Sequence, residues 1–329
     1  MVANGQPNLS APRAVHLPEG NRLDNIRIDF DESFKEQDEW LQWVPKKRVL
    51  ANPVKNSLVR LHYFILKRLG LWDPMVMNGF IHNWFDEFLE YWSNCLCGRP
   101  INIMDFHGLM LHYRKAFHSL VNLSWSSTSQ HISNYQSSEN LFCLMSLILR
   151  DALTPLRAPA VTNLITSDMT ILEFGCCHAP VYRSWRLFLN HKSCKWFLAD
   201  IPNFGFHYAR HIYGQDDAIR FITIDADHFD DPLKGVSHKF DIIIVQEVFE
   251  HLHNPRLIAE YLVDRLKPEG FFAFDYVESD AKGLDTPAGL EKRDETLDFL
   301  NEMLVPLKIS KSAGNAQSGL RILSKRKRS

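Results

Sequence analysis

The chain has 329 residues, of which 45% are hydrophobic and 23% charged, values that are ordinary for a globular protein long enough for two domains. Its formal net charge of -2 excludes the strongly basic composition of a general nucleic-acid binder, so we expect no nucleic-acid partner. No apolar run approaches the roughly 18 residues of a membrane span, and residues 1–19 lack the apolar core of a signal peptide. The six cysteines form no C-x-x-C pair, which favours free thiols in a reducing, cytoplasmic compartment over a disulfide framework.

The first half of the chain predicts a tail followed by a helical domain. Residues 1–30 predict a flexible tail, and from residue 31 to 165 the apolar residues follow a helical period. The clearest helix covers residues 81–92, where aromatic and aliphatic side chains line one face and acidic side chains the other. Further helices are expected over residues 56–69, 106–117 and 141–153.

A polar segment from residue 124 to 140 interrupts this helical pattern. It contains Trp125, His131, Asn134 and Tyr135. Loops near the ligand-binding edge of a sheet often carry function, so these four residues are candidate substrate contacts. We expect the aromatic stripe of the preceding 81–92 helix to lie in the core instead.

From about residue 169 the pattern changes to short apolar runs that alternate with helical segments. Strands are predicted over residues 170–174, 196–200, 219–225, 240–246, 270–275, 307–310 and 320–324. Helices are predicted over residues 181–190, 206–213, 257–266 and 297–304. Such alternation predicts right-handed βαβ units and a mostly parallel sheet that binds ligands at the carboxyl ends of its strands. We therefore predict an α/β fold over residues 166–329: a Rossmann-like, seven-stranded sheet with helices on both faces and the last two strands as an antiparallel edge.

Acidic residues close the first three predicted strands of this sheet. Glu173 is followed by Gly175, where the missing Cβ would let a ligand approach the backbone, and the next helix would offer its first N–H groups to a carboxylate. Asp200 ends the second strand at a spacing suited to binding ribose hydroxyls. Asp225 follows the third strand, with Asp227 as an alternative ligand two residues later.

The fourth strand leads into Gln246, Glu247 and His251, close to where the reactive end of a ligand would lie. Glu247 and His251 are therefore candidate general bases. The alternative is that His251 caps the next helix or packs beneath the ligand. His207 and His211 have the i, i+4 spacing of metal ligands, but no third ligand is near in sequence, so we predict no metal site.

These segments resemble the class I methyltransferases that depend on S-adenosylmethionine (SAM). Residues 173–176 are similar to the first motif of that family, and residues 197–202 to its ribose-binding strand. Residues 240–255 and 266–271 are similar to its fourth- and fifth-strand signatures. The resemblance covers about half of the chain and identifies nothing in the helical half.

The resemblance implies SAM as the cofactor, with Gly175 at its methionine moiety, Asp200 at its ribose, and Asp225 and Ala226 at its adenine. The full set of implied cofactor-binding residues is Glu173, Gly175, Cys177, Asp200, Ile201, Asp225, Ala226 and Gln246. The family usually has further glycines where this chain has Cys177 and Ala179, so the methionine end of SAM is expected to lie differently.

The implied activity is SAM-dependent methyl transfer to a small molecule, by in-line attack on the sulfonium methyl group. The helical domain would close over the site and exclude water, and His251 or Glu247 would act as base where the acceptor must lose a proton. The glycine-poor loop leaves open a second reaction, in which the aminocarboxypropyl arm of SAM is transferred or cyclised and methylthioadenosine is released. A third possibility is a non-catalytic, SAM-fold binding or scaffold protein, against which the retained acids argue. The sequence leaves the oligomeric state undetermined.

Overall fold

The computed structural model describes residues 84–96, 98, 100–119, 123–153, 156–190, 192–277, 284–309 and 320–325, with the short pieces 13–14, 27–28, 65 and 68. The chain falls into two compact units. The described residues up to 119 and those of 137–153 belong to the first unit, and residues 123–136 belong with 156–325 to the second. Residues 124–136 of the polar segment are therefore grouped with the C-terminal part of the chain, although they precede residue 166.

From residue 84 onward, the described part of the first unit is mainly helical. It contains α4 (Trp84–Asn94), α5 (Ile103–Ser119), the 3-10 turn η1 (Ser138–Asn140) and α7 (Leu141–Leu153). The aromatic stripe of α4 lies in the core, as Trp84 and Phe88 are fully buried. Phe106 of α5 meets the Phe88 ring edge-on at 4.9 Å between centroids, the arrangement that aromatic rings favour.

The predicted tail and first helix fall mostly outside the described residues. Two short strands, β1 (Arg13–Ala14) and β2 (Arg27–Ile28), pair antiparallel. Of the helix predicted over residues 56–69, Ile65 and Arg68 are described, and both are helical.

The second unit contains a seven-stranded sheet with the order β5-β4-β3-β6-β7-β9-β8. Its strands are β3 (Thr170–Phe174), β4 (Lys195–Asp200), β5 (Ile219–Thr223), β6 (Phe240–Val245), β7 (Leu266–Phe274), β8 (Leu304–Ile309) and β9 (Arg321–Lys325). The first five are parallel, so the predicted Rossmann-like sheet is confirmed. The edge differs in detail, because β9 inserts antiparallel between β7 and β8, and β8 therefore runs in the direction of β7.

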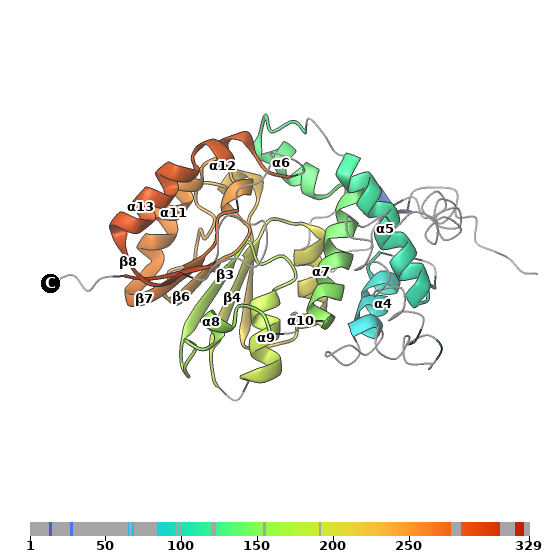
Figure 1. The fold of residues 1–329 in the computed structure, drawn as a ribbon, viewed down its shortest axis with the longest axis horizontal. Coiled ribbons are helices and arrows are strands. Elements are labelled where there is room, and N and C mark those ends of the chain that lie inside the picture. Colours follow the sequence, from blue (N-terminus) through green and yellow to red (C-terminus); the bar gives the residue numbers. More distant parts are fainter. Residues whose placement is uncertain are drawn as a thin grey trace, which may run out of the picture. The chain divides into compact units, whose positions relative to one another are not determined.

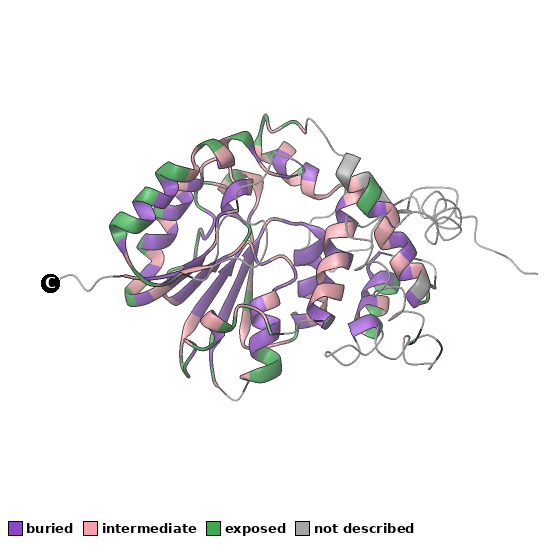
Figure 2. Cartoon of the chain, in the orientation of Figure 1, coloured by how far each residue is buried: buried purple, intermediate pink, exposed green. Residues whose placement is uncertain are grey.

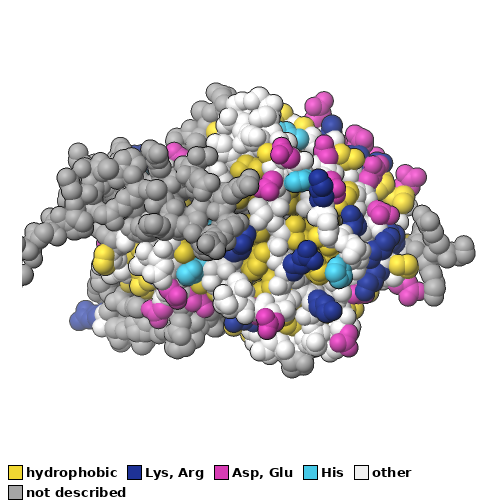
Figure 3. All heavy atoms as spheres, turned by 180° about the vertical axis from the view of Figure 1, so that it is seen from behind, with side chains coloured by type: hydrophobic (Ala, Val, Ile, Leu, Met, Phe, Trp, Pro, Cys, Tyr) yellow, Lys and Arg dark blue, Asp and Glu magenta, His cyan; other side chains and the backbone are white. Residues whose placement is uncertain are grey.

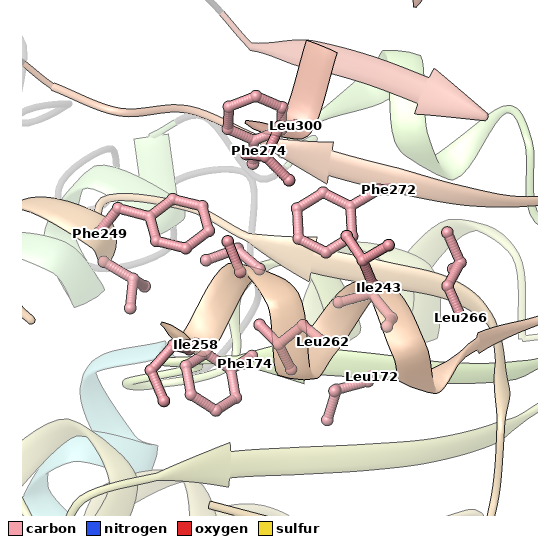
Figure 4. Packing of buried hydrophobic residues seen from close by; sticks show 14 of the residues in the cluster. Leu172, Phe174, Ile243, Phe249, Ile258, Leu262, Leu266, Phe272, Phe274 and Leu300 are labelled. Carbon is pink, nitrogen blue, oxygen red and sulfur yellow. The ribbon is translucent and has the colours of Figure 1, made fainter. Parts of the chain in front are cut away.

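Helices cover both faces of this sheet, with a hydrophobic core on each side (Figure 1). One face is covered by α8 (Pro159–Thr162), α9 (Pro180–Phe188) and α10 (Phe204–Tyr213), and the other by α11 (Pro255–Arg265) and α13 (Arg293–Met303). Neighbouring residues of β6 alternate between the cores, because Ile244 points to the first and Ile243 to the second (Figure 4). A strand buried on both faces needs a continuous apolar run, and Figure 2 shows the central strands as buried.

Short helices that the apolar pattern does not predict lie in the segments around the carboxyl edge of this sheet. They are α6 (Thr128–Tyr135), α12 (Pro287–Glu291) and the 3-10 turns η2 (Ala226–His228) and η3 (Phe249–His251). Ser127 caps α6 by accepting the N–H of Gln130 at 3.1 Å. The α6 segment is joined to the sheet through Gln136, which follows this helix. Its Nε2 donates to the carbonyl of Pro202, just after β4, at 2.9 Å.

None of the helices that the structure describes is both long and apolar enough to cross a membrane. On the described part of the face in Figure 3, Lys and Arg side chains lie among Asp and Glu side chains. This mixture agrees with the small net charge of the whole chain.

Candidate active site

The candidate site lies at the carboxyl edge of β3, β4, β5 and β6. These strands are parallel neighbours, so the residues that follow them meet at one edge of the sheet. The structure thereby gathers the segments that hold the predicted cofactor residues, although those residues are spread from position 173 to position 246.

The loop after β3 keeps a glycine-like backbone without the glycines. Gly175, Cys177 and Ala179 have φ values of +65°, +48° and +56°, all in the left-handed region. That region costs a residue with a Cβ about 1 kcal/mol, and glycine almost nothing. Pro180 then starts α9, where its fixed φ suits the first helical turn. Cys177 and Ala179 thus adopt a backbone conformation that glycine adopts at lower cost.

Close packing surrounds this loop. A Cβ on Gly175 would lie 2.3 Å from Cγ2 of Val248, so the space expected to admit a ligand is filled by a side chain that follows β6. A Cβ on Gly205 would lie 2.2 Å from the Cys177 sulfur. The Cys177 thiol therefore occupies the room that Gly205 leaves at the start of α10.

Glu173 connects β3 to the start of α9. Its buried carboxylate accepts the N–H of Val181 at 3.1 Å and the N–H of Tyr182 at 2.9 Å. A carboxylate is favourable at this end of a helix because of the unpaired N–H groups there. Those two donors, expected to face a ligand, are therefore used within the protein. A direct contact between Glu173 and the cofactor stays a prediction.

Asp200 joins the end of β4 to the same loop. Its Oδ2 accepts the N–H of Cys177 at 2.6 Å, and its Oδ1 accepts the N–H of Ile201 at 2.7 Å. Burial raises the pKa of Asp200 to about 6, although these donors and the Asn203 side chain oppose the shift. A carboxylate offers about four acceptor directions, so ribose hydroxyls would be further donors of the kind that this group needs.

Asp225 and Ala226 lie half-buried where β5 leads into η2. The Asp225 side chain makes no capping hydrogen bond to η2, so this turn does not use the carboxylate as a cap. The Asp200 carbonyl accepts the N–H of Ile224 at 2.9 Å, which holds the end of β5 beside the end of β4.

The residues after β6 are organised by Asp275, an acid at the end of β7 to which sequence reasoning assigned no role. The N–H of Glu247, an exposed residue with φ of +54°, donates to Asp275 Oδ1 at 2.6 Å. The Gln246 side chain also hydrogen-bonds Asp275. Burial raises the pKa of Asp275 to about 6. Its position after a parallel strand is the same signal that identified Asp200.

His251 of η3 is held by a segment far along the chain. Its Nδ1 lies 3.1 Å from the Leu284 carbonyl and 3.1 Å from Asp285 Oδ1. Both partners are acceptors, so in the neutral ring Nδ1 carries the proton and Nε2 has the lone pair. Burial opposes protonation, but the hydrogen bond to Asp285 and the charge of Glu250 outweigh it and raise the pKa of His251. Neither periodicity nor spacing in the sequence signals Asp285.

The described residues contain no group of three or more His, Cys, Asp or Glu side chains placed to hold a metal. His207 is fully buried on α10, and burial lowers its pKa to about 3. The described cysteines are free thiols.

Three of the four candidate substrate contacts come together in an aromatic–histidine cluster. Its members are Trp125, His131, Tyr135, Phe229, His251 and His253. Asn134, the fourth candidate, instead donates from Nδ2 to the Ser124 carbonyl at 2.8 Å. It thereby closes the segment that carries the other three.

A family model described as a methyltransferase domain matches residues 172–274, about a third of the chain. No match was found among the curated proteins. Similar solved structures include the N-methyltransferase NodS from Bradyrhizobium japonicum WM9, which is 18% identical. That match covers 54% of this chain and 96% of NodS, with a TM-score of 0.40.

Two further similar structures come from other organisms. A methyltransferase from Pyrococcus furiosus is 18% identical, with coverage of 53% of this chain and 84% of that one and a TM-score of 0.37. A putative rRNA-methylase from Clostridium thermocellum is 10% identical, with coverage of 51% and 93% and a TM-score of 0.39. The family match runs from β3 to β7 and takes in the loop after β3, the acids Glu173, Asp200 and Asp225, and His251. Asp275 and Asp285 lie beyond it. Over residues 172–274, the C-terminal unit of this chain is therefore similar to a methyltransferase domain.

Proposed function

We propose that this protein transfers a methyl group from SAM to a small-molecule acceptor. The observation that supports this most is the backbone of the loop after β3. It is left-handed at Gly175, Cys177 and Ala179, although only the first of these is a glycine. A conformation that costs about 1 kcal/mol at each non-glycine position persists only where the surroundings require it. Asp200 supplies that requirement in part, through its bond to the Cys177 N–H.

The acids at the sheet edge suit the hydroxyl and amino groups of SAM. When bound, SAM supplies a methyl group made electrophilic by the sulfonium centre. Asp200 would accept hydrogen bonds from the ribose hydroxyls, and Asp225 from the adenine amino group, with Ile201 and Ala226 beside them. Gln246, fixed by Asp275, would stand near the methionine end with Gly175 and Cys177.

His251 is the better candidate for the general base. Its Nδ1–H is held by Leu284 and Asp285, which leaves the Nε2 lone pair to receive a proton from an acceptor hydroxyl or amine. Asp285 is then a positioning residue, because it acts through His251. Glu247, the other candidate, is exposed, and its backbone N–H donates to Asp275.

One observation favours the second reaction of SAM. Because Glu173 uses the N–H groups of Val181 and Tyr182, these donors are less available to the methionine carboxylate. An arm held elsewhere would present a different carbon of the sulfonium to the acceptor. Transfer or cyclisation of the aminocarboxypropyl arm is therefore the alternative.

Mass spectrometry of the by-product separates the two reactions. We would incubate the full chain with SAM and a panel of neutral small acceptors, and assign S-adenosylhomocysteine to methyl transfer and methylthioadenosine to the alternative. Calorimetric titration with SAM comes first, with Asp200→Asn as the site variant and Asp217→Asn, an acid in the turn before β5, as the control. Absence of SAM binding by the wild-type chain would refute both reactions and leave a non-catalytic role.

A further inference from the structure

The aromatic–histidine cluster is formed by segments that meet within the second unit. Phe229 follows η2, and His253 follows η3, so both come after the carboxyl ends of parallel strands. The α6 segment adds His131, whose ring centroid lies 5.1 Å from Phe229 and 4.9 Å from His253. Tyr135, on the next turn of α6, lies 6.0 Å from His251 between centroids. The cluster therefore includes the candidate base.

Two ring nitrogens in this cluster lack hydrogen-bond partners. They are Nδ1 of His131 and Nε2 of His253, and both atoms are shielded from solvent. His131 as a whole is only 2% exposed. A buried polar atom without a partner costs about 1–3 kcal/mol, so proteins seldom leave one unpaired. Two such atoms on neighbouring rings are available to the polar group of one ligand.

The environment of His131 selects the chemistry of that partner. Burial, together with the charges of His253 and His251, lowers the pKa of His131 to about 3. The imidazole is therefore neutral near pH 7, with one donor nitrogen and one acceptor nitrogen. The surrounding rings of Trp125 and Phe229 offer flat apolar surfaces, which favour stacking with a planar ring and disfavour a charged group.

We propose that the aromatic–histidine cluster is the acceptor subsite, and that the acceptor is a neutral, planar aromatic compound with a hydroxyl or amine group. That polar group would bind His131 Nδ1 and His253 Nε2, and the ring would lie among the aromatic side chains. The role of the bound compound as methyl acceptor rests on the proposed methyl transfer, whereas its binding to the cluster does not. Because both nitrogens are shielded, entry of the ligand requires the α6 segment to shift.

The test uses 2-naphthol as a neutral aromatic probe, 2-naphthoate as its anionic counterpart and cyclohexanol as a non-aromatic alcohol. Binding to the full chain is measured by ligand-observed NMR. We expect wild-type protein to bind 2-naphthol at least about tenfold more tightly than the other two probes. His131→Phe should weaken 2-naphthol binding about tenfold, through loss of one hydrogen bond. His131→Asn, whose amide can replace Nδ1, should stay within about threefold of wild type.

The matched control is Trp185→Phe on α9. Trp185 Nε1 is also buried without a partner, but this side chain lies beside Cys194 and Ala218, which precede β4 and β5 at the opposite edge of the sheet. The control should bind 2-naphthol as wild type does. Removing an unpaired buried nitrogen should leave the melting temperature of His131→Phe unchanged or raised, and His253→Phe provides a second variant if His131→Phe fails to fold.

Two results would overturn the inference: failure of the wild-type chain to bind 2-naphthol, or undiminished binding by both His131→Phe and His253→Phe. The outcome is separable from that of the proposed function through the calorimetric SAM titration. If the protein binds 2-naphthol in a His131-dependent way but does not bind SAM, the subsite is supported and the proposed methyl transfer is excluded. If the protein binds SAM and the His131 substitution leaves 2-naphthol binding unchanged, the subsite is excluded and the proposed methyl transfer is not.

Discussion

Replacing Ala179 with glycine tests whether the loop after β3 really holds its left-handed backbone. Ala179 is fully buried and has φ of +56°. Ala209 in α10 is equally buried in the same core, but it lies inside a helix. Both substitutions delete one buried methyl group, worth about 0.8 kcal/mol, and both give the unfolded chain more freedom. The two sites share the same burial and the same core but differ in backbone conformation.

Ala209→Gly should lower the free energy of unfolding by about 1.5–2 kcal/mol, since the lost methyl adds to the roughly 1 kcal/mol helix cost of glycine. In Ala179→Gly, relief of about 1–2 kcal/mol of left-handed strain offsets the losses, so the free energy of unfolding should stay within about 0.5 kcal/mol of wild type. Urea unfolding of the full chain followed by circular dichroism measures both. Equal destabilisation by the two substitutions would contradict the proposed strain at Ala179.

Three further predictions concern the site. Asp285→Asn should lower the pKa of His251, so the rise of the methyl-transfer rate with pH should move to lower pH. The limiting rate should fall at least about tenfold, because the ring is less well oriented. An unshifted pH profile would exclude the positioning role of Asp285. The raised pKa also means that ionised His251 stabilises the wild-type fold at low pH, and that this stabilisation is lost as pH rises through its folded-state pKa. Glu173→Gln should reduce the free energy of unfolding by about 1 kcal/mol, measured by urea unfolding, because the charge at the start of α9 is lost. Asp225→Asn should weaken SAM binding about tenfold in calorimetry. Asp227, two residues later, is exposed, and equal weakening by Asp227→Asn would contradict the choice of Asp225 as the adenine ligand.

The strands of the sheet could be predicted because their chemistry is local. Thr170–Phe174 was predicted to the residue, and the run Phe240–Val245 is apolar enough to require burial on both faces. Asp200 and Asp225 were placed correctly at one edge, because parallel strands carry their ends there. Their assignment as ligand contacts stays a prediction.

The α6 segment shows where such reasoning stops. Its pattern is polar, and His131 and Asn134 are its buried residues, too few to give a helical hydrophobic period. Its stability comes from the Ser127 cap, the bond of Gln136 to Pro202 and ring contacts to residues more than 90 positions away. The contacts among the histidines are therefore not predictable, although His131 itself is a predicted substrate contact.

The sequence by itself determined the sheet and the approximate positions of its strands, because apolar period and turn residues are local properties of the chain. The binding of a nucleotide at the loop after β3 stays a prediction. Only the tertiary structure decided what the side chains there do: that Glu173 serves α9, that Val248 fills the space beside Gly175, and that Asp285 holds His251. Hydrogen bonds and packing act over a few ångströms in space. Partners separated by tens of residues in the chain are known only once the fold has brought them together.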